Sequence, residues 1–174
     1  SGHWLPLACT LNASRILDAV GAMSGLGYEE LDEAALSVPD AGGLRLVPYF
    51  EGERTPNLPD ATARLEGMTL KNSTRAHLAR AGVEGLLTHM RFALECVREL
   101  GVPIEKVLVV GGGARSRAVQ SLAPEFLGVP VEFPEAAEYV ALGAARQAGM
   151  LNIVSSQACG HPDHCANQAG GLDV

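Results

Sequence analysis

The sequence predicts an α/β fold with a largely parallel sheet. Helical and strand patterns alternate along the second half of the chain, and a wholly apolar strand (106–110, KVLVV) runs directly into three glycines and a helix. Apolar residues make up 47% of the 174 residues. That fraction is enough for the core of one domain and excludes disorder for most of the length.

The N-terminal part predicts two short helices. Asn12 has a side chain suited to the N-cap of a helix over 13–23, whose apolar residues recur on one stripe, and Gly25 is placed to end that helix. A second helix is expected over 29–37, before a run of helix-breaking residues.

A strand and a long loop follow. The segment 44–50 (LRLVPYF) has the composition of a strand, and Pro48 places it at a sheet edge or a strand end. The segment 51–72 is rich in Gly, Pro, Asn and Thr and shows little periodicity, so we expect a loop. Loops of this length in a compact domain are usually functional.

The longest helix is predicted over 75–100, with Ser73 or Thr74 as its cap. Gly82 and Gly85 lie inside it, and each costs about 1 kcal/mol relative to alanine. Glycine at this spacing usually permits the close approach of another backbone, so we expect a tightly packed neighbour.

The strand 106–110 is followed by a glycine turn, a helix over 115–122, a strand over 130–133 and a helix over 139–150. Because this strand lacks polar alternation, we expect it to be central and covered on both faces. Glycine amides beside a helix N-terminus favour an anion such as a nucleotide phosphate, although three glycines can also serve only as a tight turn. The turn consists of Gly111, Gly112, Gly113 and Ala114.

The local pattern leaves the kind of nucleotide site open. A P-loop requires a Lys-Ser/Thr pair, which does not follow this turn. The dinucleotide-binding fingerprint fits Gly111 and Gly113, but Ser116 occupies the position of its third glycine. Glu132 lies where a ribose-binding acid is expected. A Rossmann dinucleotide-binding domain is therefore an alternative.

Several polar side chains also admit two interpretations. Arg54 could clamp a phosphate or a carboxylate, or it could brace the loop by pairing with Glu51 or Glu53. His77 and His89 lie in the long helix without a carboxylate or cysteine one turn away, which favours packing or surface roles over catalysis. We expect no metal site from these residues.

Composition and charge exclude other classes of protein. The 13 Lys and Arg against 20 Asp and Glu give a net charge of −7, which argues against nucleic acid or an anionic membrane as the partner. No apolar run reaches the roughly 18–20 residues of a membrane span. Residues 1–4 lack the features of a secretory signal and cysteines are few, so we expect a cytoplasmic protein.

The last 20 residues lack periodicity, and we expect a flexible tail. The tail holds four side chains of zinc-binding types, but their crowding in one short run is awkward for a tetrahedral site, so incidental ligands are favoured. These are Cys159, His161, His164 and Cys165.

Taken together, the segments resemble the C-terminal lobe of the FGGY carbohydrate kinases. GERTP (52–56), the helix sequence TRAHLAR…EG (74–85) and GGGARS (111–116) in this order are specific to that pattern, whereas each motif alone is not. Gly82 departs from it, because the family usually has a larger residue there. The segments that carry the resemblance are 4–21, 46–70, 73–86, 100–133 and 138–150.

The resemblance implies an actin-like, ribonuclease-H-like lobe with a central sheet flanked by helices, one of two lobes that close over ATP and a sugar. Residues 1–152 are then the C-terminal, nucleotide-binding lobe without its first strands, and 153–174 form the tail. The glycine turn is expected to hold the adenosine and α-phosphate, with Ser116 and Arg117 next to the nucleotide. Glu53 and Arg54 are expected to order a loop at the interlobe cleft.

The same resemblance implies ATP and Mg²⁺ as cofactors and D-xylulose as the sugar acceptor, with ribulose, gluconate and glycerol as alternatives. The general base is expected to be an Asp of the missing N-terminal lobe, so no catalytic residue is assigned to this chain. We therefore expect the chain to be inactive alone and to have the N-terminal lobe as its partner. A homodimer stays open.

Overall fold

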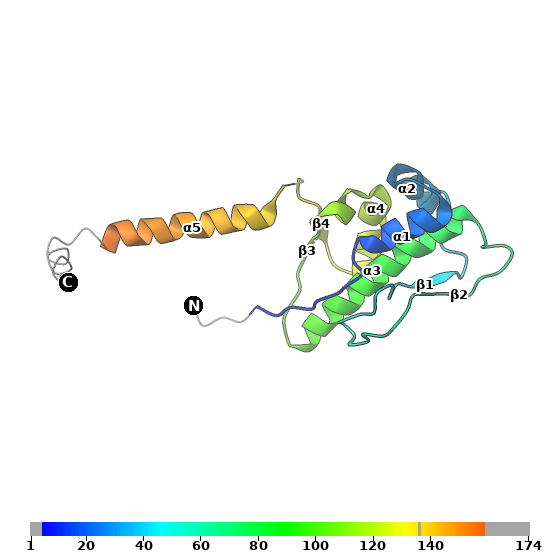
Figure 1. The fold of residues 1–174 in the computed structure, drawn as a ribbon, viewed down its shortest axis with the longest axis horizontal. Helices are drawn as coiled ribbons and strands as arrows, with labels where there is room; N and C mark the ends of the chain where they lie inside the picture. Colours follow the sequence, from blue (N-terminus) through cyan, green and yellow to red (C-terminus); the bar gives the residue numbers. More distant parts are fainter. Residues whose placement is uncertain (1–4, 136, 159–174) are drawn as a thin grey trace, which may run out of the picture. The chain divides into compact units, whose positions relative to one another are not determined.

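The computed structural model describes residues 5–135 and 137–158 (Figure 1). The chain divides into two compact units, Ser1–Pro134 and Glu135–Val174. The second unit contains one helix, α5 (Tyr139–Ala158). The first unit contains α1 (Arg15–Ser24), α2 (Tyr28–Leu36), β1 (Arg45–Val47), β2 (Arg64–Glu66), α3 (Arg75–Glu99), β3 (Val107–Leu108), the 3₁₀ turn η1 (Gly112–Arg115), α4 (Arg117–Leu127) and β4 (Val131–Glu132).

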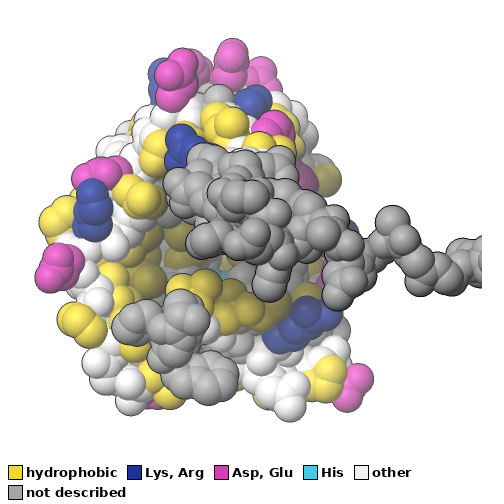
Figure 2. Space-filling view, turned by 90° about the vertical axis from the view of Figure 1, so that its left-hand side faces the viewer, with side chains coloured by type: hydrophobic (Ala, Val, Ile, Leu, Met, Phe, Trp, Pro, Cys, Tyr) yellow, Lys and Arg dark blue, Asp and Glu magenta, His cyan; other side chains and the backbone are white. Residues whose placement is uncertain are grey.

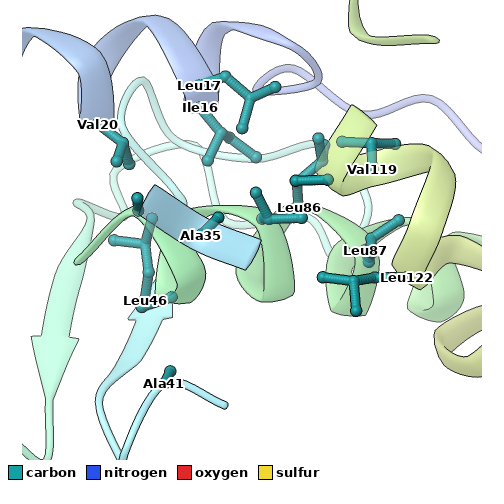
Figure 3. Close-up of a cluster of buried hydrophobic side chains, with 14 of the residues drawn as sticks. Ile16, Leu17, Val20, Ala35, Ala41, Leu46, Leu86, Leu87, Val119 and Leu122 are labelled. Carbon is teal, nitrogen blue, oxygen red and sulfur yellow. The ribbon is translucent and has the colours of Figure 1, made fainter. Parts of the chain in front are cut away.

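The long helix α3 is the centre of the first unit. It packs against α1, α2, α4 and β1 (Figure 1). Figure 3 shows Ile16 and Val20 of α1 on one side of α3 and Leu46 of β1 on the other. These three side chains are at most 4% exposed, and Leu87 of α3 is fully buried. The hydrophobic core therefore surrounds the first half of α3.

Two glycines of α3 allow its neighbours to come this close. A Cβ at Gly82 would lie 2.7 Å from Cγ2 of Val20, and a Cβ at Gly85 would lie 2.8 Å from the carbonyl oxygen of Leu46. Real Cβ atoms essentially never show either distance. The predicted close approach is therefore confirmed, with a backbone atom as the neighbour at Gly85 and a side chain at Gly82.

The helix caps agree with the prediction at α3 but not at α1. Thr74 caps α3, because its side chain accepts a hydrogen bond from the His77 amide at 3.2 Å. The prediction that Asn12 caps the first helix is wrong. Helix α1 begins at Arg15, after Ser14, because the Asn12 side chain is bound to the loop at Gly52.

The strands are shorter and more numerous than predicted. Within 44–50 only β1 is a strand, and it pairs antiparallel with β2, so the prediction of a continuous loop over 51–72 is wrong. Three residues are too few to show a strand period in the sequence. Arg45 of β1 faces Glu66 of β2 in the register and forms an ion pair with it.

Strands β3 and β4 pair in parallel, in agreement with the α/β class, but they form a separate two-stranded sheet from the antiparallel pair β1–β2, so one largely parallel sheet is not observed among the described residues. Coverage of β3 on both faces is not observed among the described residues. Val109 is buried, whereas Leu108 and Val110 are about half exposed. Side chains alternate along an extended segment, so only one of its faces meets the core of the first unit.

The last two predicted helices exist with shifted bounds. Helix α4 starts after the η1 turn and continues through Pro124 to Leu127, whereas 115–122 was expected. Helix α5 starts as expected and extends beyond 150 to Ala158. The domain boundary at 152 and the flexible tail stay predictions, and the four tail residues with zinc-binding side chains lie outside the described residues.

Charged side chains are mixed on the face shown in Figure 2. Acidic and basic side chains lie around its margin, and hydrophobic side chains gather towards its middle. The described part of this face therefore presents no extended basic patch of the kind that binds nucleic acid. In the described ranges, no helix is both long and apolar enough to cross a bilayer.

We expect Gly85→Ala to lower the free energy of unfolding by about 1–3 kcal/mol, because overpacking against the Leu46 backbone exceeds the gain in helix propensity of about 1 kcal/mol. Gly82→Ala meets the Val20 side chain instead, so Val20→Ala should partly rescue it. Urea denaturation of the single and double variants measures this coupling. Stabilisation by Gly85→Ala, or equal rescue of both glycine variants by Val20→Ala, would contradict the packing described.

Candidate functional site

The glycine turn borders a pocket of about 470 Å³. This volume lies in the range of small-molecule sites. Its walls come from three places in the sequence: the start of α1, the start of α2, and the turn with the residues after it. The lining residues are Ser14, Leu17, Asp18, Tyr28, Glu29, Leu31, Asp32, Gly112, Gly113, Arg115 and Ser116.

A second pocket, of about 580 Å³, lies between β1, β2 and α3. Its charged lining groups include Arg45, Arg64 and Glu66, which pair with one another, and Glu84, which pairs with Arg80. Two arginines thus share one carboxylate, and no ion pair with a described residue involves Asp40, which also lines this pocket. The first pocket, by contrast, contains the glycine turn that the sequence indicates as an anion site. We therefore take the pocket at the glycine turn as the candidate site.

The three glycines of the turn differ in backbone conformation and in their surroundings. Gly111 has a φ of +96°, a conformation that side chains disfavour. Gly113 lies against α1, with a Cβ position 3.4 Å from Cβ of Ser14. A Cβ at Gly112 would meet nothing within 4 Å, so the backbone there faces open space. The turn thus presents bare backbone to the pocket.

The N-terminus of α4 is occupied by a carboxylate of the protein. Asp32 of α2 is 6% exposed, and it accepts hydrogen bonds from the amides of Arg117 (2.7 Å) and Ala118 (3.2 Å) and from the Ser116 hydroxyl (2.5 Å). Ser116 Oγ in turn accepts a hydrogen bond from the Val119 amide. The first three amides of α4 are therefore satisfied internally.

The remaining donors for an anion lie on the turn and beside it. In the described parts of the chain, the amides of Gly112 and Gly113 have no hydrogen-bond acceptor. Arg115 lines the pocket, is exposed, and forms no ion pair with a described acidic residue. Backbone amides and a guanidinium together are a typical phosphate-binding set.

The opposite rim of the pocket is aromatic and acidic. Tyr28 is 69% exposed, and its hydroxyl donates a hydrogen bond of 2.5 Å to Oδ1 of Asp18. This hydrogen bond and the negative charge of Asp18 raise the pKa of Tyr28. The phenol therefore stays neutral and its ring is held between α1 and α2, where a flat base can stack on it.

Three of the six predicted nucleotide-binding residues line the pocket and three do not. Gly112, Gly113 and Ser116 line the pocket, and Gly111 and Ala114 belong to the turn without lining it. The sixth, Arg117, does not line the pocket, and its Nη2 lies 3.3 Å from Oε1 of Glu33 on the surface.

Sequence reasoning missed eight of the eleven lining residues, among them Arg115, Tyr28 and Asp32. Arg115 lies in the GGGARS motif, so the motif itself carried that signal. No sequence motif pointed to Tyr28 and Asp32, because they approach the turn only through the packing of α2 against α4.

The GERTP loop is anchored by a buried carboxylate. Glu53 is 1% exposed and accepts hydrogen bonds from Asn12 Nδ2 (3.0 Å) and from the amides of Leu11 (2.8 Å) and Arg54 (2.7 Å). His89 Nε2 lies 2.8 Å from Oε2 of Glu53, but its N–H is not aligned with the oxygen, so this contact is an ion pair when the ring is protonated. Glu53 thus joins the loop to α3 and to the segment before α1.

Burial raises the pKa of Glu53, but the hydrogen bonds from Asn12, Arg54 and Leu11, together with His89, outweigh it, so that the pKa lies below the ordinary value. Glu53 is therefore a buried anion at neutral pH that binds amides of the loop and of the segment before α1. Its place at an interlobe cleft stays a prediction.

Arg54 and the two histidines have local partners. The Arg54 side chain approaches Sγ of Cys9 at 3.6 Å and pairs with neither glutamate, because Glu51 pairs with Arg15. His77 bonds the cap residue of α3 through Nδ1, and His89 is the buried partner of the loop. Among the described residues, no three His, Cys, Asp or Glu side chains converge on one point as metal ligands.

Comparison with known proteins points to one family. Residues 5–151 match the C-terminal domain of the FGGY family of carbohydrate kinases. The chain is 39% identical over 151 residues to the xylulose kinase of Streptomyces coelicolor, covering 86% of this chain and 30% of that protein. It is 37% identical over 123 residues to a glycerol kinase of Nitratidesulfovibrio vulgaris, covering 70% of this chain and 24% of that protein.

A solved structure shows the same fold. The xylulose kinase of Bifidobacterium adolescentis superposes with a TM-score of 0.77 at 58% identity, covering 84% of this chain and 29% of that one. The chain therefore spans about 30% of the length of the xylulose kinases it matches.

We expect Glu53→Gln to lower the free energy of unfolding by about 1–3 kcal/mol at neutral pH, since buried hydrogen bonds to a carboxylate are lost. The pKa of Glu53 is lowered in the folded state, so its contribution is complete above the unfolded pKa and is lost as the pH falls through the folded value. The difference between wild type and variant should therefore shrink below pH of about 4.

Chemical denaturation across pH measures this effect. Glu51→Gln, which alters the exposed neighbour paired with Arg15, is the matched control and should change stability by less than about 1 kcal/mol. A difference between Glu53→Gln and wild type that grows on acidification would show that the carboxylate is not stabilising the fold as an anion.

Proposed function

This chain belongs to the FGGY family of carbohydrate kinases, and we propose that it is the nucleotide-binding part of a xylulose kinase, which transfers the γ-phosphate of ATP to D-xylulose and forms D-xylulose 5-phosphate. Family membership agrees with the resemblance seen in the sequence and replaces the Rossmann alternative. Glu132, the candidate ribose ligand of that alternative, pairs with Lys106 and does not line the pocket.

The pocket at the glycine turn is the observation that carries the proposal. We place the base and ribose between Tyr28 and the start of α1, and the phosphates towards the amides of Gly112 and Gly113 and the guanidinium of Arg115. The nucleotide-binding set predicted from the sequence remains part of the proposal. It consists of Gly111, Gly112, Gly113, Ala114, Ser116 and Arg117.

The rest of the reaction belongs to other parts of the protein in this proposal. The general base and most sugar contacts would come from the N-terminal lobe, so the chain alone would be inactive, and Glu53 and Arg54 would order one edge of the cleft. Phosphoryl transfer depends mainly on positioning and charge stabilisation, and this chain would supply the positioning of ATP. A cytoplasmic location and a homodimer remain predictions.

Mg²⁺ would arrive with the nucleotide. Asp18 accepts a hydrogen bond from Tyr28, and Asp32 accepts hydrogen bonds from the N-terminus of α4. Glu29 is the remaining carboxylate of the pocket. Mg²⁺ commonly uses one or two carboxylates together with substrate phosphates. The pocket therefore does not offer a dedicated metal site, and we derive no step through the ion.

For the sugar acceptor, the relatives suggest more than one candidate. Relatives named xylulose kinase and relatives named glycerol kinase differ little in identity to this chain, at 39% and 37%. The xylulose kinase structure at 58% identity favours D-xylulose. Glycerol, gluconate and ribulose remain the alternatives.

We expect the intact protein to release ADP from Mg²⁺-ATP mainly with D-xylulose when D-xylulose, D-ribulose, gluconate and glycerol are offered separately. A coupled ADP assay measures this, with ATP alone as the control. Preference for another acceptor would replace D-xylulose within the family, and sugar-independent ADP release alone would contradict the kinase proposal.

Arg115→Gln should weaken binding of ADP by about tenfold and that of adenosine by less than about twofold, because a phosphate contact is lost. Arg98→Gln is the matched control, since that guanidinium pairs with Glu95 on α3 and does not line the pocket. Calorimetry with both ligands measures the effect. If Arg98→Gln weakened ADP binding more than Arg115→Gln does, or if Arg115→Gln weakened adenosine binding as much as ADP binding, the phosphate would not lie at Arg115.

A further inference from the structure

We propose that Asp32 is a positioning residue of the nucleotide pocket: it fills the N-terminus of α4 with a carboxylate of the protein and so leaves phosphate binding to the glycine turn and Arg115. This inference rests on the proposed function for the identity of the ligand. The arrangement of α2, the turn and α4 is observed independently of the proposed function.

Asp32 contacts the start of α4 across a long separation in the sequence. Asp32 is 84 to 86 residues away from its three partners in the sequence, and its two oxygens bind the Arg117 and Ala118 amides and the Ser116 hydroxyl. A carboxylate at this position satisfies amides that have no partner within the helix and compensates the positive end of the helix dipole. The contact therefore fixes the direction in which α4 leaves the turn.

One of the two amides that Asp32 binds belongs to a buried residue. Ala118 is fully buried, so solvent cannot replace the carboxylate at its amide. A buried amide without a partner is costly, so the first turn of α4 would have to move if Asp32 were neutralised. Ser116 would move with it, and Ser116 lines the pocket.

The carboxylate of Asp32 also makes the N-terminus of α4 unfavourable for phosphate. A helix N-terminus is ordinarily an attractive place for phosphate, but here its donors are taken and a negative charge already lies beside them. A phosphate placed there would face Asp32 without free amides. The amides of Gly112 and Gly113 and the Arg115 side chain are the positive groups that remain in the described pocket.

Asp32→Asn tests the proposal in the intact protein. An asparagine amide group presents N–H to one of the amides that Asp32 accepts from, so the variant should disturb the turn without a change in size. Glu33→Gln is the matched control, because Glu33 is the next residue of α2 and pairs with Arg117 at the surface. The readouts are ADP affinity by calorimetry, the KM for ATP and for the sugar, and thermal unfolding.

Asp32→Asn should raise the Kd for ADP and the KM for ATP by about tenfold and leave the KM for the sugar within about twofold. Glu33→Gln should change none of these by more than about twofold. If Asp32→Asn unfolds at lower temperature but binds ADP as wild type does, Asp32 only stabilises the fold and the proposal is overturned. Tighter ADP binding would overturn it as well, because phosphate would then be using the α4 N-terminus.

Two further measurements cover the remaining outcomes. If Asp32→Asn does not fold, Ser116→Ala takes its place, because it removes one bond of the same contact and should weaken ADP binding by about threefold. If the wild type does not bind ADP, the proposed function fails, and amide exchange over residues 112–118 then decides. Faster exchange in the Asp32 variant supports positioning, and unchanged exchange overturns it.

Discussion

The close contact of α3 with α1 and β1 is the constraint on which the rest of this structure depends. Gly82 and Gly85 let the two neighbours approach α3 from opposite sides, to distances that a methyl group would prevent. Helix α1 then provides one wall of the pocket, and β1 leads into the loop that carries Glu53. A change in the spacing at α3 would therefore move both, because close-packed interiors transmit displacements.

Two buried carboxylates fix the irregular segments on this framework. Glu53 binds backbone amides of the GERTP loop and of the segment before α1, and Asp32 binds amides at the start of α4. Each replaces the regular hydrogen bonds that a loop or a helix end lacks. The hydrogen bonds to Glu53 hold its pKa below the ordinary value, so the GERTP loop is held by charge as well as by packing.

Features were predictable from the sequence when the residues that determine them are close together along the chain. The cap at Thr74 and the glycine turn were predicted because their signals lie within a few neighbouring residues, whereas the parallel pair β3–β4 was predicted from the order of strand, turn, helix and strand. The roles of Asn12 and Asp32 were not, because their partners lie about 40 and 84 residues away and no local pattern records them. The contact of His89 with Glu53 was not predicted either, and only a packing or surface role was expected for this histidine, because the loop that supplies its partner comes 36 residues earlier in the sequence.

The charges of the pocket also determine how a nucleotide would lie in it. Three carboxylates, Asp18, Glu29 and Asp32, line the side formed by α1 and α2, whereas Arg115 and the bare amides lie at the turn. Base and ribose carry hydrogen-bond donors that carboxylates accept, and phosphates are repelled by the same groups. A nucleotide bound as proposed would therefore place its base between α1 and α2 and direct its phosphates towards Gly112, Gly113 and Arg115.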